Sequence, residues 1–212
     1  MSKVRVHISV SADGYVAGPN QSTEEPLGEG GEQLHEWVVS LAAWREAHGR
    51  QGGEVNASSA VVEEATSNVG AEIMGRGKFG GGPGPWSDDP PWNGWWGDDP
   101  PFHMPVFVLT SHEREPLTLT DTTFTFVTDG IESALEQACA AAGDGDVTIG
   151  GGAAAINQYL AAGLVDELEL HVAPVVLGGG ARLFEGLGPD LALEQIRVID
   201  APGVTHLKYR VG

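Results

Sequence analysis

The chain of 212 residues carries 11 Lys or Arg against 30 Asp or Glu, a formal charge of −19 that argues against nucleic acid as a partner, since binding to phosphates needs clustered cations. Its single cysteine, Cys139, excludes an internal disulfide and a cysteine-rich metal site. No stretch holds the roughly 18 to 20 apolar residues of a bilayer span, and no apolar leader precedes the first predicted strand, so we expect a cytoplasmic protein that does not bind membranes, with one domain over residues 1–212.

The first third of the chain predicts a strand, two helices and a second strand. Apolar residues alternate with polar ones over residues 4–10, the period of a half-buried strand, which is expected to end at Ala12-Asp13-Gly14. Apolar residues at helical spacing over residues 33–48 predict an amphipathic helix. Asn56 is a suitable cap for a second helix whose apolar positions extend to Val69, and residues 71–74 predict a short strand.

Glycine, proline and tryptophan dominate residues 80–105, which are too interrupted by proline for a helix or a strand. Loops of this length are commonly lids or binding loops, and four of the six tryptophans lie here, which argues against plain disorder. Trp92, Trp95 and Trp96 are expected either to stack on a flat heterocycle or to close a dimer surface. The pairs Asp88-Asp89 and Asp98-Asp99 each precede two prolines and are expected to be solvated turn residues.

The remainder of the chain alternates strands with helices and closes with a hairpin. We predict strands at residues 106–109, 124–127, 146–149 and 168–172, and helices at residues 131–142 and 153–162. Asp129 and Glu132 resemble a capping box at the start of the first of these helices. Residues 195–199 and 205–211 flank Pro202-Gly203 as a terminal hairpin. The sum predicts an α/β fold with an antiparallel end.

The segment Gly75-Arg76-Gly77-Lys78-Phe79-Gly80 follows a predicted strand and matches the spacing G-x-G-x-x-G. We do not assign a dinucleotide fingerprint to it, because glycine and proline follow Gly80 where the helix should continue. Glycines nevertheless let backbone amides approach an anion, and Arg76 and Lys78 place two of the chain's 11 cations at this turn. The segment therefore predicts an anion site, with a solvated turn as the alternative.

Two further strand ends carry anion-binding chemistry. Gly150-Gly151-Gly152 links a strand to a helix, so the helix N-terminus can contact a pyrophosphate closely; a structural turn is the alternative. The hydroxyls and imidazole of Thr110-Ser111-His112 suit a ribose phosphate. Because ligands of open α/β sheets bind beyond the carboxyl ends of the strands, we expect these two turns to converge with the Gly75 turn. Gly178-Gly179-Gly180 precedes no predicted helix and is expected to form a tight bend.

Other kinds of catalytic site lack their sequence signals. The seven histidines show no metal-ligand spacing, and His35-Glu36 lacks the second histidine of H-E-x-x-H, so we expect no metal. Neither the G-x-S-x-G elbow of serine hydrolases nor the phosphate loop of nucleoside triphosphatases is present.

Taken in order along nearly the whole chain, several segments resemble the dihydrofolate reductase-like proteins related to the reductase domain of bacterial riboflavin biosynthesis. The resemblance is carried by residues 11–18, by Ile73-Met74-Gly75-Arg76, and by residues 106–111, 147–152 and 163–180. It implies a dihydrofolate reductase-like fold of three layers, with a mixed, mostly parallel sheet and an antiparallel C-terminal hairpin. It also implies a reductase that uses NADPH and assembles as a homodimer.

The resemblance further implies where NADPH binds. Gly75, Arg76, Gly77 and Lys78 correspond to a helix start near the phosphates, and Thr110, Ser111 and His112 look like the group that holds the 2′-phosphate. Gly150, Gly151 and Gly152 look like the pyrophosphate turn, although Ala153 follows where dihydrofolate reductases often carry a basic residue. Ala17 and Gly18 correspond to a mobile loop over the nicotinamide.

The substrate end of the site departs from that pattern. Dihydrofolate reductases place an essential carboxylate in their first helix, facing the pterin, and the corresponding stretch here holds Glu29, Glu32 and Glu36 in a reworked segment. Asp13 is the predicted substrate-positioning or proton-supplying acid, with an ordinary Asp-Gly turn as the alternative. We therefore predict an NADPH-dependent reductase that transfers hydride to a planar heterocycle, pterin-like, pyrimidine-like or related. The alternative is a catalytically silent NADPH-binding or interaction protein on the same fold.

Overall fold

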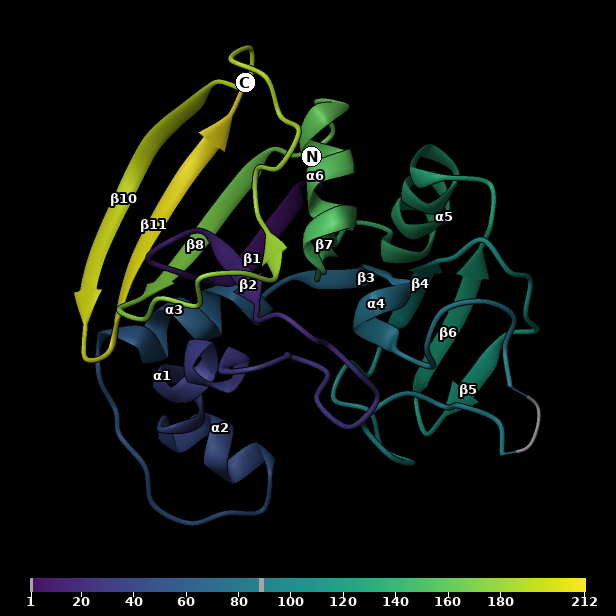
Figure 1. Ribbon diagram of the computed structural model, residues 1–212, viewed down its shortest axis with the longest axis horizontal. Helices are drawn as coiled ribbons and strands as arrows, with labels where there is room; N and C mark the ends of the chain where they lie inside the picture. Colours follow the sequence, from purple (N-terminus) through teal and green to yellow (C-terminus); the bar gives the residue numbers. More distant parts are fainter. Residues whose placement is uncertain (1, 88–89) are drawn as a thin grey trace.

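A computed structural model describes residues 2–87 and 90–212, so the predicted Asp88-Asp89 turn lies outside the described residues. The chain folds around one nine-stranded sheet within that part of the sequence (Figure 1). In spatial order its strands are β10 (Leu193–Ala201), β11 (Val204–Val211), β8 (Glu167–Ala173), β1 (Val4–Ser11), β7 (Asp146–Ile149), β3 (Val69–Gly75), β4 (Pro105–Leu109), β6 (Thr122–Val127) and β5 (Leu117–Leu119). A second, two-stranded sheet pairs β2 (Tyr15–Ala17) with β9 (Ala181–Arg182).

The central strands are parallel and both edges are antiparallel. Neighbours from β8 through β1, β7, β3 and β4 to β6 run parallel. At one edge, β11 runs antiparallel to β8 and β10, which confirms the predicted C-terminal hairpin; at the other, β5 runs antiparallel to β6. The predicted mixed, mostly parallel α/β sheet is therefore confirmed.

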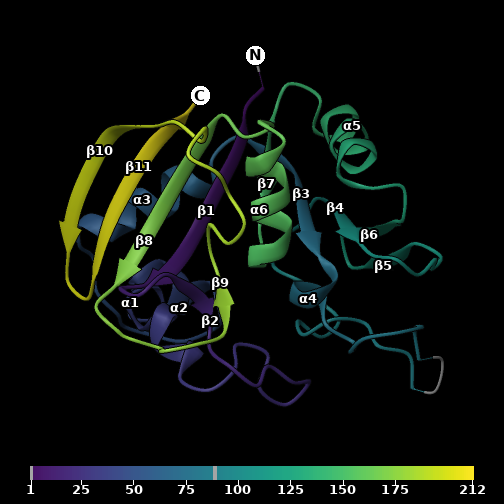
Figure 2. The ribbon, with the colours of Figure 1, turned by 45° about the horizontal axis from the view of Figure 1, so that its top comes forward.

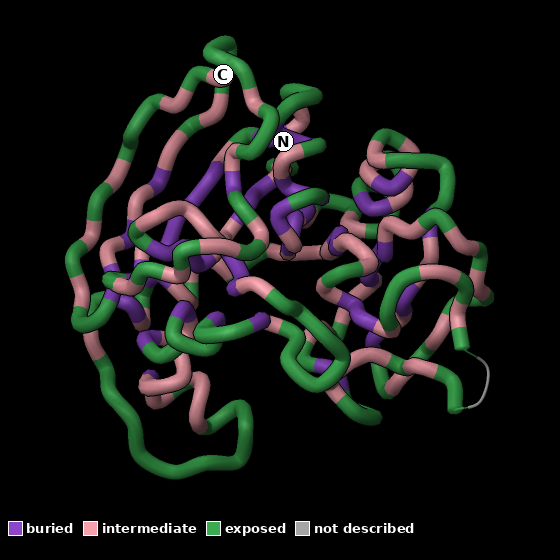
Figure 3. The backbone as a smooth tube through the Cα atoms, viewed as in Figure 1, coloured by how far each residue is buried: buried purple, intermediate pink, exposed green. Residues whose placement is uncertain are grey.

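Helices cover both faces of this sheet, giving three layers (Figure 2). They are η1 (Gly31–His35), α1 (Glu36–Val39), α2 (Ala42–Ala47), α3 (Ala57–Thr66), α4 (Arg76–Phe79), α5 (Ile131–Ala142) and α6 (Ala153–Ala161). Successive side chains of β1 point to opposite faces. Val6 and Val10 join the core that contains Ala134 of α5 and Ile156 of α6, whereas Ser9 accepts a hydrogen bond from Trp37 of α1 on the opposite face. Buried residues accordingly lie mainly in the central strands (Figure 3).

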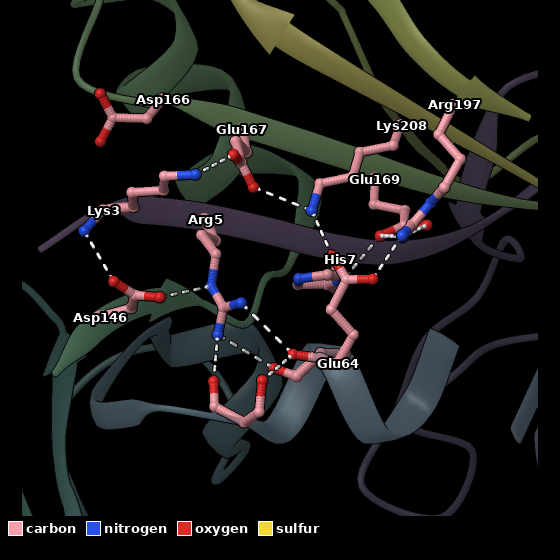
Figure 4. A network of polar contacts seen from close by, with 12 residues as sticks. Lys3, Arg5, His7, Glu64, Asp146, Asp166, Glu167, Glu169, Arg197 and Lys208 are labelled. Carbon is pink, nitrogen blue, oxygen red and sulfur yellow. Dashed lines mark hydrogen bonds and ion pairs between the residues drawn. The ribbon is translucent and has the colours of Figure 1, made fainter. Parts of the chain in front are cut away.

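A network of ion pairs fixes α3 to the sheet (Figure 4). Glu64 of α3 pairs with Arg197 of β10 and with Lys208 of β11, the latter at 2.7 Å. Arg197 also bonds the carboxylate of Glu169, which is 1% exposed, at 2.9 Å, and Arg5 of β1 donates to the carbonyl of Ser67 just beyond α3. Since a buried charge is tolerated only when it is paired, this network sets where α3 lies.

The N-terminal helical segment differs from its prediction. One helix over residues 33–48 is wrong: η1, α1 and α2 divide this stretch, and Leu41 between the last two is extended. The cause is a backbone pairing with a distant residue, because the amide of Ala42 donates to the carbonyl of Glu54 at 2.8 Å and the amide of Glu54 donates to that of Ser40 at 2.9 Å. The predicted Asn56 cap of α3 is confirmed, with its side chain accepting from the amide of Ser58.

Two other local predictions are wrong. The capping box at Asp129 and Glu132 does not form, because α5 starts after Gly130, which makes no side-chain cap. Val69, predicted in the second helix, begins β3 instead.

The proline-rich segment forms a long loop, as predicted, and carries an aromatic cluster. Trp86, Trp92 and Trp96 pack against buried Phe79 and Phe124 over β4 and β6. The loop is thereby held on the sheet by apolar contact rather than by backbone pairing. In the described part of the chain, no helix has both the length and the apolar character to cross a membrane.

Candidate functional site

A cavity of about 610 Å³ lies beyond the carboxyl ends of three parallel strands and at the start of α6. Gly75, Leu109 and Gly150 line it from the ends of β3, β4 and β7. Ile8 of β1 and Ala17 of β2 contribute the apolar side. Residues that are distant in the sequence thus meet in one cavity, because the carboxyl ends of parallel strands lie at the same edge of the sheet.

The first predicted turn lies in this cavity. Gly75, Arg76, Gly77 and Lys78 all line it. The guanidinium of Arg76 stacks on the ring of Trp86, 3.3 Å from its centroid, and its Nη1 donates to the hydroxyl of Thr110 at 3.4 Å. Its Nε and Nη2 atoms are buried and have no hydrogen-bond partner among the described residues.

The electrostatic setting of Arg76 favours an anionic ligand. Burial lowers the pKa of the guanidinium, and the neighbouring charge of Arg114 lowers it further. Two adjacent cations repel each other, so an anion bound between them relieves that repulsion and supplies acceptors for the unpaired Arg76 nitrogens.

The second predicted turn is packed against the first. The amide of Gly75 donates to the carbonyl of Gly151 at 2.7 Å, and Gly150 and Gly152 line the cavity ahead of α6. Gly151 has φ of +104°, which favours glycine. A Cβ at Gly150 would overlap the Glu72 carboxylate and the Lys78 amine, which pair with each other at 2.7 Å. Glycine at position 150 therefore makes room for that ion pair.

The third predicted turn touches the site only at one end. Thr110 bonds Arg76, whereas Ser111 is exposed and His112 receives a hydrogen bond on its carbonyl from the Trp86 indole at 2.9 Å. None of the three residues of this turn lines the cavity itself. Only Thr110 is shown to contact Arg76, and the part of all three residues in binding stays a prediction.

The loop after β1 is packed backbone to backbone with two other segments. A Cβ at Gly18 would overlap the carbonyl of Glu29, a Cβ at Gly28 would overlap the carbonyls of Gly18 and Pro19, and one at Gly180 would overlap the carbonyl of Ala17. Ala17 lines the cavity, whereas Gly18 does not. Residues 12–30 and 178–182 therefore form a double-layered wall, named the glycine wall below.

Asp13 lies outside the cavity lining and within the glycine wall. Its carboxylate accepts hydrogen bonds from the Ser11 hydroxyl at 2.6 Å and from the amides of Leu177 and Gly178 at 3.1 and 2.7 Å. The Ser11 bond is the largest cause that lowers its pKa to about 2, and the two amides add to it. An ionised carboxylate with three donors holds a loop in place; whether Asp13 also acts on a substrate stays a prediction.

Two of the three predicted stacking tryptophans reach the cavity. Trp95 and Trp96 line it, and the Trp95 indole donates to the Lys78 carbonyl at 2.9 Å. Trp92 instead donates to the Phe79 carbonyl and packs edge-on against Trp95. The prediction that these rings contact a flat heterocycle is thus geometrically feasible for Trp95 and Trp96.

The predicted carboxylates of the first helical segment do not face the cavity. Glu29, Glu32 and Glu36 are exposed and absent from its lining, and Glu29 accepts a hydrogen bond from Asn20. The side chain of this segment that does line the cavity is His35, the last residue of η1. From the sequence, His35 is considered only as a metal ligand, so its position in the site is new information from the fold.

A group of potential metal ligands lies elsewhere in the described structure. Asp99, His103 and Asp121 are all exposed, with ligand atoms within 4.8 Å of one another, and His103 bonds Asp121 at 2.6 Å. Exposed acidic residues commonly gather in this way without an ion, so the group adds no function to the site.

The lining side chains are mainly apolar, with two cations and one imidazole among them. Among the described lining residues there is no serine, threonine, cysteine or carboxylate. The arrangement can bind an extended molecule with anionic groups at one end and a flat apolar group at the other.

Comparison with known proteins gives the same architecture. The family model of the RibD C-terminal domain matches residues 2–206. A search of curated protein sequences found no match. A solved structure of a protein assigned to riboflavin biosynthesis from Shewanella sp. PV-4 is similar, with 22% identity, a TM-score of 0.66 and 99% of each chain covered.

Two further solved structures share the fold at lower identity. RibD from Acinetobacter baumannii matches all of this chain over 58% of its own length, with 17% identity and a TM-score of 0.57. Dihydrofolate reductase from Enterococcus faecalis, complexed with NADP(H) and RAB-propyl, matches 99% of this chain over 96% of its own length, with 12% identity and a TM-score of 0.54. With its sheet order and the family match over 2–206, the chain belongs to the RibD C-terminal domain family and has a dihydrofolate reductase-like fold.

Proposed function

We propose that this protein is an NADPH-dependent reductase that transfers hydride to a planar heterocycle, pterin-like, pyrimidine-like or related. Membership of the RibD C-terminal domain family supports a reductase-type function. The observation that carries the proposal is the half-buried Arg76 guanidinium, with two buried nitrogens lacking a partner among the described residues, beside two glycine turns in one cavity of a chain with net charge −19. Such a concentration of donors in an acidic molecule is suited to a phosphorylated ligand.

The residues of the cavity fit NADPH on its phosphate side. Arg76 would hold a phosphate with its unpaired Nε and Nη2 atoms, and Thr110 lies within hydrogen-bond distance of the same guanidinium. The backbone at Gly150-Gly151-Gly152, ahead of α6, would face the diphosphate. Bound NADPH supplies the hydride, so the protein itself needs no nucleophile.

The protein contributes position and exclusion of water. Trp95 and Trp96 from the long loop, Leu27 from the loop after β2 and Ala17 from the glycine wall enclose the rest of the cavity with apolar surface. A flat acceptor held among these side chains would share the cavity with the nicotinamide, and holding two reactants in one orientation contributes much of the rate of such a reaction.

The proposal is tested by following the absorbance of the reduced nicotinamide with a panel of pterins, pyrimidinediones and related heterocycles. We expect turnover with at least one of them, and a larger rise in the thermal melting temperature with NADPH than with NADH. A rise with NADPH but no turnover on any acceptor would instead indicate a catalytically silent NADPH-binding protein. No rise with either cofactor would exclude both functions.

A further inference from the structure

His35 is held in the cavity wall by its neighbours in η1 and α1. Leu34 is fully buried, and Trp37 is 7% exposed with its indole nitrogen donating to the Ser9 hydroxyl at 3.2 Å. Between these two anchors His35 lines the cavity, while its Nδ1 atom is buried and has no hydrogen-bond partner among the described residues. A buried imidazole nitrogen without a hydrogen-bond partner lowers the stability of the fold, so its presence in the cavity wall points to a function.

The other polar side chains of the cavity are already engaged or chemically unsuited to give up a proton. Lys78 is paired with Glu72 at 2.7 Å, and Arg76 is a guanidinium stacked on Trp86. The amide of Gln158 donates to the Ala154 carbonyl at 3.0 Å, and neither it nor Gln21 titrates. Of the described residues that line the cavity, His35 is therefore the titratable side chain that forms no ion pair and no hydrogen bond to another side chain; its ring contacts the Gly31 backbone.

Reduction of a C=N or C=O bond needs a proton as well as a hydride. Bound NADPH would supply the hydride for the new C–H bond as the π bond breaks, and the electron pair of that bond would move to the nitrogen or oxygen of the acceptor. That atom then takes a proton, and the balance is NADPH plus acceptor plus one proton giving NADP⁺ and the reduced acceptor. A positioned acid that supplies this proton commonly contributes a factor of about 10² to 10⁴ to the rate.

We propose that His35 is the catalytic acid of this site, delivering from its imidazole the proton that accompanies hydride transfer. This inference rests on the proposed reductase function. After each turnover the ring is reprotonated from solvent, and the exposed carboxylates of Glu32 and Glu36 on the same helical segment take no part because they do not line the cavity.

The surroundings of His35 favour the neutral ring in the free protein. Burial lowers the pKa of the ring, and the charge of Lys78 from α4 lowers it further; contact with the Gly31 backbone acts in the opposite direction. His171 of β8 also interacts electrostatically with His35, which is one of the causes that lower the pKa of His171. Binding of an anionic cofactor would favour the imidazolium form, so that the ring carries its proton when the acceptor arrives.

The test compares His35→Gln with His48→Gln. Glutamine at position 35 keeps a polar side chain of similar size but has no titratable proton. His48 is exposed at the end of α2, stacked on Trp44 and absent from the cavity lining, so it is a matched control. We expect kcat for His35→Gln to fall about 100-fold with KM for NADPH nearly unchanged, and kcat for His48→Gln to equal that of the wild type.

The pH profile and the imidazole resonances separate an acid from a structural residue. In the wild type, kcat should fall as pH rises through the pKa of His35 in the complex; in His35→Gln this decline should disappear. Saturating NADPH should also shift the His35 ring resonance in NMR spectra, a readout that needs no turnover. Circular dichroism melting identifies a variant that fails to fold, in which case the wild-type pH profile and resonance shift decide the question.

The outcomes distinguish this inference from the proposed function. If the wild type turns over but His35→Gln keeps its rate and pH profile, or if the His35 resonance does not move with NADPH, the acid role is overturned and the reductase function stands. If the wild type reduces no acceptor, the reductase function fails and the acid role fails with it.

Discussion

At the scale of single residues, Arg76 is the side chain that we expect to bind an anionic ligand most strongly. Its guanidinium is fixed against Trp86 and Thr110, yet two of its three nitrogens have no partner among the described residues. Leaving donors on a charged group unsatisfied costs free energy in the free protein. A phosphate that accepts from them recovers that free energy, so Arg76 should discriminate strongly in favour of a phosphorylated cofactor.

Replacing Arg76 with glutamine should weaken NADPH binding about 10- to 100-fold, since hydrogen bonds to charged groups contribute about 1.5–3 kcal/mol. NADH affinity should change by less than about threefold, because the residue is next to Thr110 on the side assigned to the 2′-phosphate. Titration of nicotinamide fluorescence measures both affinities. Arg50→Gln, exposed beside Trp44, serves as the control and should bind like the wild type. An equal loss for both cofactors would instead place Arg76 at the diphosphate.

At the scale of elements, a buried pair of histidines joins two strands and a helix. His171 of β8 and His206 of β11 share a hydrogen bond between their Nδ1 atoms at 2.8 Å, and the Nε2 atom of His206 contacts the Ser58 hydroxyl of α3 at 2.9 Å. Only one proton fits between two Nδ1 atoms, so the hydrogen bond between the rings is lost when both rings are charged. Burial, followed by the charge of Arg197, lowers the pKa of His206 from 6.5 to about 4.

This pair predicts a loss of stability in mild acid. Because the folded pKa of His206 lies below its ordinary value of 6.5, the unfolded chain binds more protons, so its stabilising contribution is complete above pH 6.5 and declines as pH falls toward 4. Each such histidine adds a slope of up to about 1.4 kcal/mol per pH unit to the free energy of unfolding. Urea denaturation at a series of pH values should show a shallower slope for His206→Gln than for the wild type. An unchanged slope would remove His206 as a cause.

Local sequence patterns predicted the strands of the sheet better than the helices of the first third. Alternation of apolar residues located β1, and Asn56 located the start of α3, because both signals are local. The division between α1 and α2 depends on backbone bonds between Ser40 or Ala42 and Glu54, and no periodicity within residues 33–48 encodes a contact with Glu54. Tertiary contact overrode helix propensity there.

The glycine turns that line the candidate cavity were predictable from the sequence, whereas His35 was not. Gly75, Arg76 and Gly150 were singled out because glycine turns after strands have a recognisable chemistry, and their part in binding stays a prediction. His35 was missed because its significance depends on which face of η1 lines the cavity, and the 3₁₀ turn there shifts the face that a regular helix would present. Its one sequence signal is its position between Leu34 and Trp37, which are both buried.

At the scale of the whole molecule, the net charge of −19 makes self-repulsion a general term in stability. Raising NaCl from about 10 mM to about 150 mM shortens the Debye length from about 30 Å to about 8 Å and screens that repulsion. Exposed pairs such as Arg210–Glu194 lose little, since surface ion pairs contribute little. We therefore expect the melting temperature to rise over this range in calorimetry. A fall would mean that attraction within the ion-pair network of α3 outweighs the repulsion. The homodimer implied by the family resemblance stays a prediction.

The glycine wall has a consequence for how molecules enter and leave. Its backbones touch at Gly18, Gly28 and Gly180 with no space for a carbon atom between them, and the Asp13 carboxylate binds the amide of Gly178 across 165 positions of sequence. We therefore expect the stretch after β1 and the stretch before β9 to move as one unit, rather than separately, when a ligand enters or leaves this side of the cavity.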